Sequence, residues 1–188
     1  MLVAAAAIAA GIFLWPRPAS PPPQTATAQV NFGGPFTLVA APGQPFASNK
    51  LAGRPYAIFF GFTHCPDVCP TTLARLVKLR RLLGSDDAFQ IVFVTVDPER
   101  DGPREVGSYT QLFGSKIIGL TGSTAQIAKV KKDYGIFSEK VGTGDAYTVD
   151  HTATVLLFDK DQKFQSTISP EESDDTALAK LKRLAGQS

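Results

Sequence analysis

The sequence contains few of the residues that build metal and redox sites. Its 188 residues include two cysteines, two histidines and one methionine, and that methionine is Met1. Thioether ligation in the folded part is therefore excluded, and one pair of cysteines cannot form a framework of several disulfides. Soft-metal or thiol chemistry has to use Cys65, Cys69, His64 or His151.

Strong net charge is also absent. Lys and Arg outnumber Asp and Glu by only 19 to 17, and no basic cluster is interleaved with aromatic residues. Nucleic-acid binding requires such a basic surface, so we exclude that function class. The chain has no internal repeat, and 188 residues with 44% hydrophobic content can bury one core. We expect one monomeric globular domain that follows an N-terminal tail.

The first charged side chain is Arg17. The run "MLVAAAAIAAGIFLW" would form a helix of roughly 22 Å at ~1.5 Å per residue, against a hydrocarbon core of ~30 Å. A membrane anchor competes with a cleaved signal peptide, whose cleavage site would be "ATA" at residues 26–28. The lack of Lys or Arg before the run favours the anchor. We predict an anchor or signal segment at 1–16, a Pro-rich linker at 17–29 and a globular domain at 30–188, outside the cytosol.

The globular part begins with patterns of strands and one long helix. "PFTLVA" and "PFAS" flank the turn "APGQ" and predict a small hairpin. "RPYAIFFGF" and "FQIVFVTVD" are apolar runs that suit strands buried on both faces. Between them, leucines and a valine recur at helical spacing, from just after Pro70 to Gly84. These segments predict a β-α-β unit.

The second half continues the alternation. "PREVGSYTQLFG" predicts a helix, "KIIGL" a strand, and "STAQIAKVKKDYG" a helix with Ser123 as N-cap. Two strands, "AYTVDHTATVLLFD" and "KFQSTIS", precede a last helix that should bury Leu178, Leu181 and Leu184. This order predicts an α/β fold, a thioredoxin-like sandwich with an added N-terminal β-hairpin.

The motif "CPDVC" places Cys65 and Cys69 where a strand turns into a helix. The N-H groups of a helix N-terminus stabilise thiolates, so both thiols are candidates for chemistry. A disulfide closing so short a loop would contribute little stability. Thiol-disulfide exchange stays open, although the spacing is longer than the usual two residues and no proline between Pro103 and Pro170 can serve as the usual cis-proline.

His151 is the candidate third member of this site. In the predicted fold, the loop before its strand lies against the helix start, so His151 can face both thiols; a hydrogen-bonded structural histidine is the alternative. Two thiolates and one imidazole suit three-coordinate Cu(I) with an open position. Structural zinc prefers four protein ligands, and the one further candidate, His64, would be strained beside Cys65. We expect His64 to be hydrogen-bonded or to face solvent.

Three other polar segments carry weaker hypotheses. We interpret Asp67 as a helix-start cap rather than a transient metal ligand. Asp150 can either orient the ring of His151 or hydrogen-bond the loop, and both interpretations stay open. The charges of "DPERDGP", residues 97–103, are interpreted mainly as a solvated loop, with a docking surface as the alternative.

The order of five motifs resembles the Sco/SenC family, the thioredoxin-like copper chaperones of cytochrome c oxidase assembly. The motifs are "GGPFTL", "FFGFTHCPDVCPTTL", "VTVDPERDGP", "GLTG" and "YTVDHTATVLLFD", which extend over nearly all of residues 32–160. The resemblance implies copper ligands at Cys65, Cys69 and His151. It also implies one N-terminal membrane helix, with the domain facing the periplasm or the mitochondrial intermembrane space. The short, uncharged N-terminus departs from that pattern.

The sequence therefore predicts a membrane-tethered metallochaperone, a carrier rather than an enzyme. It would bind one copper ion, as Cu(I), with Cu(II) left open, and deliver it to the binuclear copper centre of an oxidase subunit. Expected partners are that subunit, a copper donor chaperone and a thioredoxin-like reductant. The first alternative is a thiol:disulfide reductase that uses the redox pair Cys65 and Cys69 to prepare the copper-ligand cysteines of the oxidase. The second is a redox or copper sensor.

Overall fold

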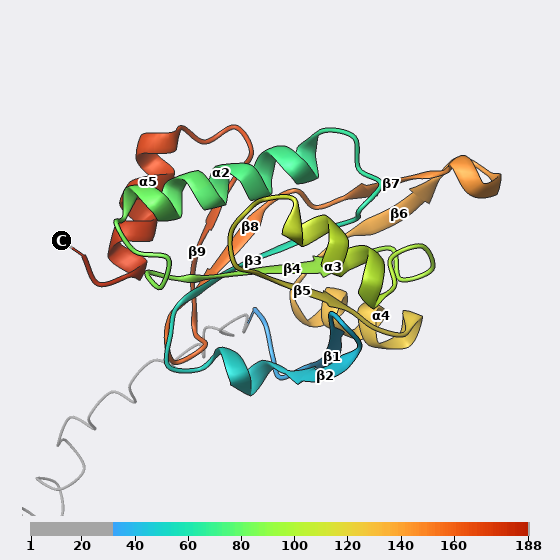
Figure 1. Cartoon of the computed structure of the whole chain (residues 1–188), viewed down its shortest axis with the longest axis horizontal. Helices are drawn as coiled ribbons and strands as arrows, with labels where there is room; N and C mark the ends of the chain where they lie inside the picture. Colours follow the sequence, from blue (N-terminus) through green and yellow to red (C-terminus); the bar gives the residue numbers. More distant parts are fainter. Residues whose placement is uncertain (1–31, 188) are drawn as a thin grey trace, which may run out of the picture. The chain divides into compact units, whose positions relative to one another are not determined.

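A computed structural model describes residues 32–187 and contains a seven-stranded mixed sheet at its centre (Figure 1). Its strand order is β2-β1-β5-β4-β3-β8-β9, and β3, β4 and β5 run parallel to one another. The thioredoxin-like α/β prediction is confirmed, as is the N-terminal hairpin formed by β1 and β2. The strands are β1 (Thr37–Ala40), β2 (Gln44–Ala47), β3 (Tyr56–Gly61), β4 (Gln90–Thr95), β5 (Ile117–Thr121), β8 (Val155–Phe158) and β9 (Phe164–Ile168).

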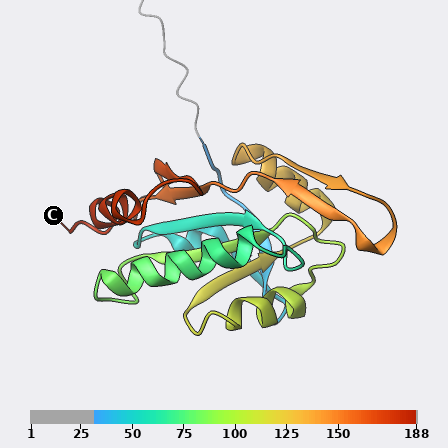
Figure 2. The ribbon, with the colours of Figure 1, turned by 90° about the horizontal axis from the view of Figure 1, so that it is seen from above.

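Helices cover both faces of this sheet. Figure 2 shows α2 and α3 on one face and α4 on the other. Helix α5 lies beside α2, and Asp174 of α5 pairs with Arg75 and Lys78 of α2. Ser123 caps α4 as predicted, in a capping box with Gln126. The helices are η1 (Ser48–Leu51), α2 (Val68–Leu82), α3 (Pro103–Gln111), α4 (Thr124–Asp133), η2 (Gly144–Ala146) and α5 (Asp174–Leu184).

The two central strands are buried along their whole length. Every residue of β3 and β4 is inaccessible or nearly so, as their continuous apolar runs predict. Tyr56 of β3 stacks on Phe158 of the neighbouring β8, with ring centroids 4.9 Å apart. At α5 the prediction was partly wrong, because Leu181 is buried whereas Leu178 and Leu184 are only partly buried. The sheet is thus a rigid base on which loops at one end can be positioned.

A second, two-stranded sheet was not predicted. It pairs β6 (Ser138–Val141) with β7 (Thr148–His151) and projects beyond the main sheet in Figure 2. The predicted single strand 146–159 is wrong, because the chain leaves regular pairing after His151 and re-enters the main sheet at Val155. The predicted loop after Gly135 contains β6, whose short and mostly exposed "SEKV" carries no apolar alternation.

The predicted anchor at 1–16 and linker at 17–29 lie outside the described residues. Among the helices of residues 32–187, none is both long enough and apolar enough to cross a membrane.

Candidate metal centre

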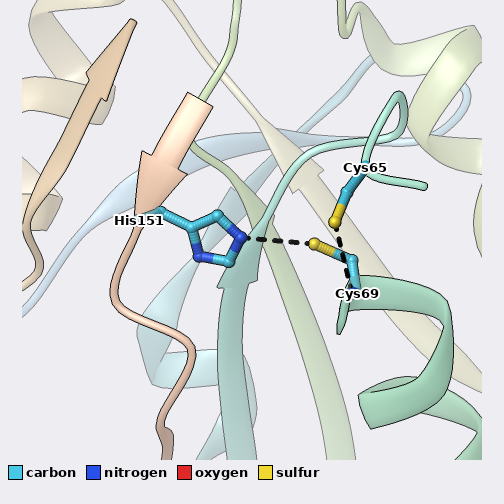
Figure 3. A group of neighbouring side chains, drawn as sticks. All are labelled: Cys65, Cys69 and His151. Atoms are coloured by element: carbon cyan, nitrogen blue, oxygen red, sulfur yellow. Dashed lines mark hydrogen bonds between the residues drawn. The ribbon is translucent and has the colours of Figure 1, made fainter. Parts of the chain in front are cut away.

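Two neighbouring cysteines and one histidine from a distant part of the chain meet at one end of the main sheet (Figure 3). Cys65 lies in the loop after β3, Cys69 in the first turn of α2, and His151 at the end of β7. One ligand atom from each, two sulfurs and one ring nitrogen, lie within 4.8 Å of one another. The structure therefore brings together the three residues predicted from the sequence.

The start of α2 sets the position of the two thiols. The helix begins at Val68, so the predicted start just after Pro70 was too late by most of one turn. Pro70 is tolerated there because N-H groups in the first turn need no helical partner. Cys69 consequently belongs to the helix, and its N-H donates to Cys65 Sγ at 3.4 Å. The N-H of Cys65 in turn donates to the carbonyl of Phe62 at 3.2 Å.

The two thiols differ in environment. Cys69 is completely buried, and burial, followed by the hydrogen bond to Cys65, raises the pKa of its thiol well above the usual range. Cys65 is partly exposed. Both are free thiols in this structure. Without metal, Cys69 therefore stays protonated, whereas Cys65 can be reached from solvent.

Gly61, the last residue of β3, allows Cys69 to approach the sheet. A Cβ atom at position 61 would lie 2.8 Å from Cys69 Sγ and 3.0 Å from ring atoms of Phe59 and Phe93. Both rings are fully buried and cannot move aside. The absence of a side chain at Gly61 is therefore a geometric requirement of this site.

The ring of His151 has a defined orientation and tautomer. Nδ1 lies 3.0 Å from the carbonyl oxygen of Thr152, which can only accept, so Nδ1 carries the proton. Nε2 then presents its lone pair to Cys69 Sγ, 3.4 Å away. The ring makes T-shaped contacts with Phe59 and Phe62, whose centroids are 6.0 and 5.8 Å away. Burial lowers the pKa of His151, which favours the neutral form that metals bind.

Comparison with known protein families shows to which family the chain belongs. Residues 24–186 match the family model described as SCO1/SenC. The chain belongs to the SCO1/SenC family. A SCO2-like protein of Rickettsia prowazekii is 37% identical over 140 residues, which cover 72% of this chain and 68% of the relative. The mouse mitochondrial SCO2 homolog is 35% identical over 156 residues, which cover 80% of this chain and 61% of the relative.

A solved structure gives the same assignment for this SCO1/SenC protein. The structure of Bradyrhizobium japonicum ScoI with copper bound is 42% identical, with a TM-score of 0.74. The match covers 81% of this chain and 99% of that one. Among the first three curated relatives, the matched region spans between 40% and 68% of the relative's length.

The other predicted polar residues of this SCO1/SenC protein lie around the three-residue cluster. His64 points outward, 53% exposed, with Nδ1 at 3.1 Å from the hydroxyl of Thr63, in agreement with the predicted hydrogen-bonding role. Asp67 occupies the N-cap position, but its carboxylate accepts from the hydroxyl of Thr71 rather than from a backbone N-H. Asp150 is exposed, and the carbonyl of Thr152, not Asp150, holds the ring of His151.

The interpretation of residues 97–103 as a solvated loop was wrong for two of its carboxylates. Asp97 is 1% exposed and Asp101 is fully buried. Asp97 pairs with Arg100 at 2.6 Å and accepts from the hydroxyl of Tyr147 at 2.6 Å. A signal was present for Asp97 alone, because it lies two residues after the end of the buried strand β4.

Proposed function

We propose that this SCO1/SenC protein is a membrane-tethered metallochaperone that binds one copper ion through Cys65, Cys69 and His151. It delivers that ion to the binuclear copper centre of a cytochrome c oxidase subunit. The observation that carries the proposal is the convergence of two sulfurs and one imidazole nitrogen within 4.8 Å. The copper bound in the Bradyrhizobium ScoI structure supports the choice of metal.

The donor set favours Cu(I) over zinc. Two thiolates and one imidazole are sufficient for Cu(I), whereas structural zinc takes four protein ligands. His64 does not supply the fourth, because its exposed ring faces Thr63 and Asp101. A three-coordinate ion also leaves an open position through which a ligand of the acceptor can enter. We expect the exchange of ligands to begin at Cys65, because this ligand is partly exposed.

The tether and the partners extend the proposal. We assign the anchor to residues 1–16 and place the domain on the periplasmic side of a bacterial inner membrane, or in the equivalent intermembrane space. The mouse relative is a mitochondrial protein, which is compatible with the second location. The copper-receiving oxidase subunit, a copper donor and a thioredoxin-like reductant are the proposed partners.

A thiol:disulfide reductase is the second candidate function. One observation favours it: Cys65 is partly exposed and Cys69 is buried beside it, an arrangement that suits an attacking and a resolving thiol. Both functions need both cysteines, so cysteine variants cannot separate them.

Replacing His151 with Ala separates the two functions, with oxidase maturation as the readout in cells that lack the native protein. A chaperone needs the nitrogen ligand, so His151→Ala should lose Cu(I) binding and fail to restore oxidase assembly. The dithiol of the same variant should still form and exchange a disulfide. His64→Ala is the matched control, since it removes the other histidine, and it should restore assembly as the unmodified chain does. If His151→Ala holds no copper yet restores assembly at ordinary copper levels, the reductase replaces the chaperone.

A further inference from the structure

Asp101 is a fully buried carboxylate in the loop between β4 and α3. Its two oxygens accept three hydrogen bonds. The N-H of Thr63 donates to Oδ2 at 2.9 Å, and the hydroxyl of Thr63 donates to Oδ1 at 2.6 Å. The hydroxyl of Thr95, at the end of β4, donates to Oδ2 at 2.6 Å. A buried carboxylate is costly unless it is bonded in this way, so all three donors matter.

Asp101 is itself fixed by the central strands. The hydroxyl of Thr121, at the end of β5, donates to the backbone carbonyl of Asp101 at 2.6 Å. The backbone N-H of Asp101 donates to the carbonyl of Asp97 at 3.0 Å. Asp101 is therefore bonded to residues at the ends of β4 and β5, and its carboxylate also accepts from the loop after β3.

The loop after β3 carries the thiol of Cys65. Thr63 precedes Cys65 by two residues, and Asp101 holds both its backbone and its side chain. Next to this contact, the N-H of Cys65 donates to the carbonyl of Phe62, the residue before Thr63. The direction of Cys65 Sγ thus depends on how the Phe62–Thr63 segment is held.

We propose that Asp101 is a positioning residue for the metal loop. By accepting two bonds from Thr63, it holds Cys65 Sγ toward Cys69 and His151. The expected effect of Asp101 on copper affinity rests on the proposed function. Its expected effect on the geometry of the two thiols does not.

The role requires a carboxylate in particular. Three donors meet two acceptor oxygens, whereas an asparagine offers one acceptor oxygen and an NH₂ group that only donates. In Asp101→Asn, an NH₂ group at the Oδ2 position would oppose the N-H of Thr63, which can only donate. An NH₂ group at the Oδ1 position would force the hydroxyl of Thr63 to turn from donor to acceptor. In both orientations the bonds to a charged carboxylate are replaced by weaker neutral ones, while the volume of the side chain stays the same.

The test compares Asp101→Asn and Thr63→Val with the unmodified full chain in detergent. Three quantities are measured for each: the free energy of unfolding without metal, the Kd for Cu(I) by chelator competition, and the copper-sulfur distances by X-ray absorption. We expect Asp101→Asn to raise the Kd about 10- to 100-fold, as loss of a residue that orients a ligand does, and to broaden the spread of copper-sulfur distances. Thr63→Val should also raise the Kd and broaden the spread of distances, but by less, because the backbone N-H of residue 63 still donates to Asp101. Thr63→Val also keeps the test decisive if Asp101→Asn does not fold.

Arg80→Lys is the control for a merely structural role. Arg80 is equally buried and donates to the carbonyl of Lys116 and the hydroxyl of Ser115, but it lies at the opposite end of α2 from Cys69. Arg80→Lys should therefore lower the free energy of unfolding and leave the Kd for Cu(I) unchanged. If Asp101→Asn and Thr63→Val lose stability but keep the Kd and the copper-sulfur distances, the positioning role is refuted.

A separate readout keeps this inference independent of the proposed function. If the unmodified chain binds no copper, the proposed function fails, and the rate at which Cys65 and Cys69 form a disulfide in a glutathione buffer decides the inference. A changed rate in Asp101→Asn and Thr63→Val, with an unchanged rate in Arg80→Lys, supports positioning. The same rate in all of them overturns it.

Discussion

At the scale of single residues, Gly61 sets the steric limit on where the sulfur of Cys69 can lie. Cys69 Sγ occupies the space that a side chain at position 61 would take, and Phe59 and Phe93 close the other sides. The sulfur can therefore approach the strand only if residue 61 has no Cβ.

Gly61→Ala should displace Cys69 Sγ, because the two buried rings cannot move aside. We expect a loss of about 1–3 kcal/mol in the free energy of unfolding, as for other overpacked cores, together with weaker Cu(I) binding. Chemical denaturation and chelator competition measure the two effects. Gly34→Ala is the control, since the nearest atom to its Cβ would be 4.0 Å away, and it should change neither. Wild-type copper affinity in Gly61→Ala would contradict the close-approach argument.

The two cysteines should also react at different rates in the reduced, metal-free protein. Burial raises the pKa of the Cys69 thiol, so almost none of it is thiolate at neutral pH, whereas Cys65 is partly exposed. We expect iodoacetamide to modify Cys65 at least about tenfold faster than Cys69. Mass spectrometry of peptides at successive times gives both rates, and the chain unfolded in urea is the control, in which the rates should converge. Faster labelling of Cys69 in the folded protein would show that the assigned burial is wrong.

At the scale of elements, the β6–β7 hairpin carries the nitrogen ligand and is held by a small cluster of polar contacts. The hydroxyl of Tyr147 donates to Asp97 at 2.6 Å, and a guanidinium N-H of Arg100 donates to the carbonyl of Tyr147 at 2.9 Å. The guanidinium also lies 3.6 Å from the centroid of the Tyr147 ring. Burial, together with the bond to Asp97, raises the pKa of Tyr147 to about 12, so the phenol remains a donor at neutral pH.

Tyr147→Phe and Tyr109→Phe form a matched pair that tests this contact. Tyr147→Phe leaves an oxygen of buried Asp97 without its donor and should make opening of the hairpin easier by about 1 kcal/mol or more. The hydroxyl of Tyr109 is buried and has no hydrogen-bond partner among the described residues, so Tyr109→Phe should be neutral or stabilising. Hydrogen exchange of the β6 and β7 amides measures the opening. Equal protection of these amides in both variants would contradict a stabilising role for the hydrogen bond from Tyr147 to Asp97.

The elements that the sequence predicted well are those with long apolar patterns. β3 and β4 follow from continuous apolar runs, and α4 follows from its Ser123 cap and its period. β6 was missed because four mostly exposed residues carry no such pattern. The break between β7 and β8 was missed because hydrophobic alternation runs through it, and only tertiary pairing with two different sheets separates the strands.

The site was predicted in part for the same physical reason. Cys65, Cys69 and His151 carry distinctive chemistry, so residue type and fold were enough to place them together. Asp97 and Asp101 are charged residues in a loop, and a charged loop is ordinarily solvated. Their burial depends on partners such as Thr63 and Tyr147, which lie far away in sequence and have no pattern that links them.

At the scale of the whole molecule, the described residues 32–187 contain a complete sheet with helices on both faces. We therefore expect a fragment of residues 30–188 to be soluble, folded and monomeric, because the described residues already form a buried core. Sedimentation and circular dichroism test this. If the fragment aggregates while the full chain in detergent does not, the N-terminal segment belongs to the fold and the predicted boundary at residue 30 is wrong.

The most direct measurement is the metal specificity of the reduced protein. Cu(I) and Zn(II) are each titrated against a chromophoric chelator, and X-ray absorption of the copper form identifies the donor atoms. We predict one Cu(I) per chain, bound by two sulfurs and one nitrogen and far more tightly than zinc, with the nitrogen donor lost in His151→Ala. Tight zinc binding without measurable affinity for Cu(I), or a copper site that His151→Ala leaves unchanged, would contradict a copper centre built from Cys65, Cys69 and His151.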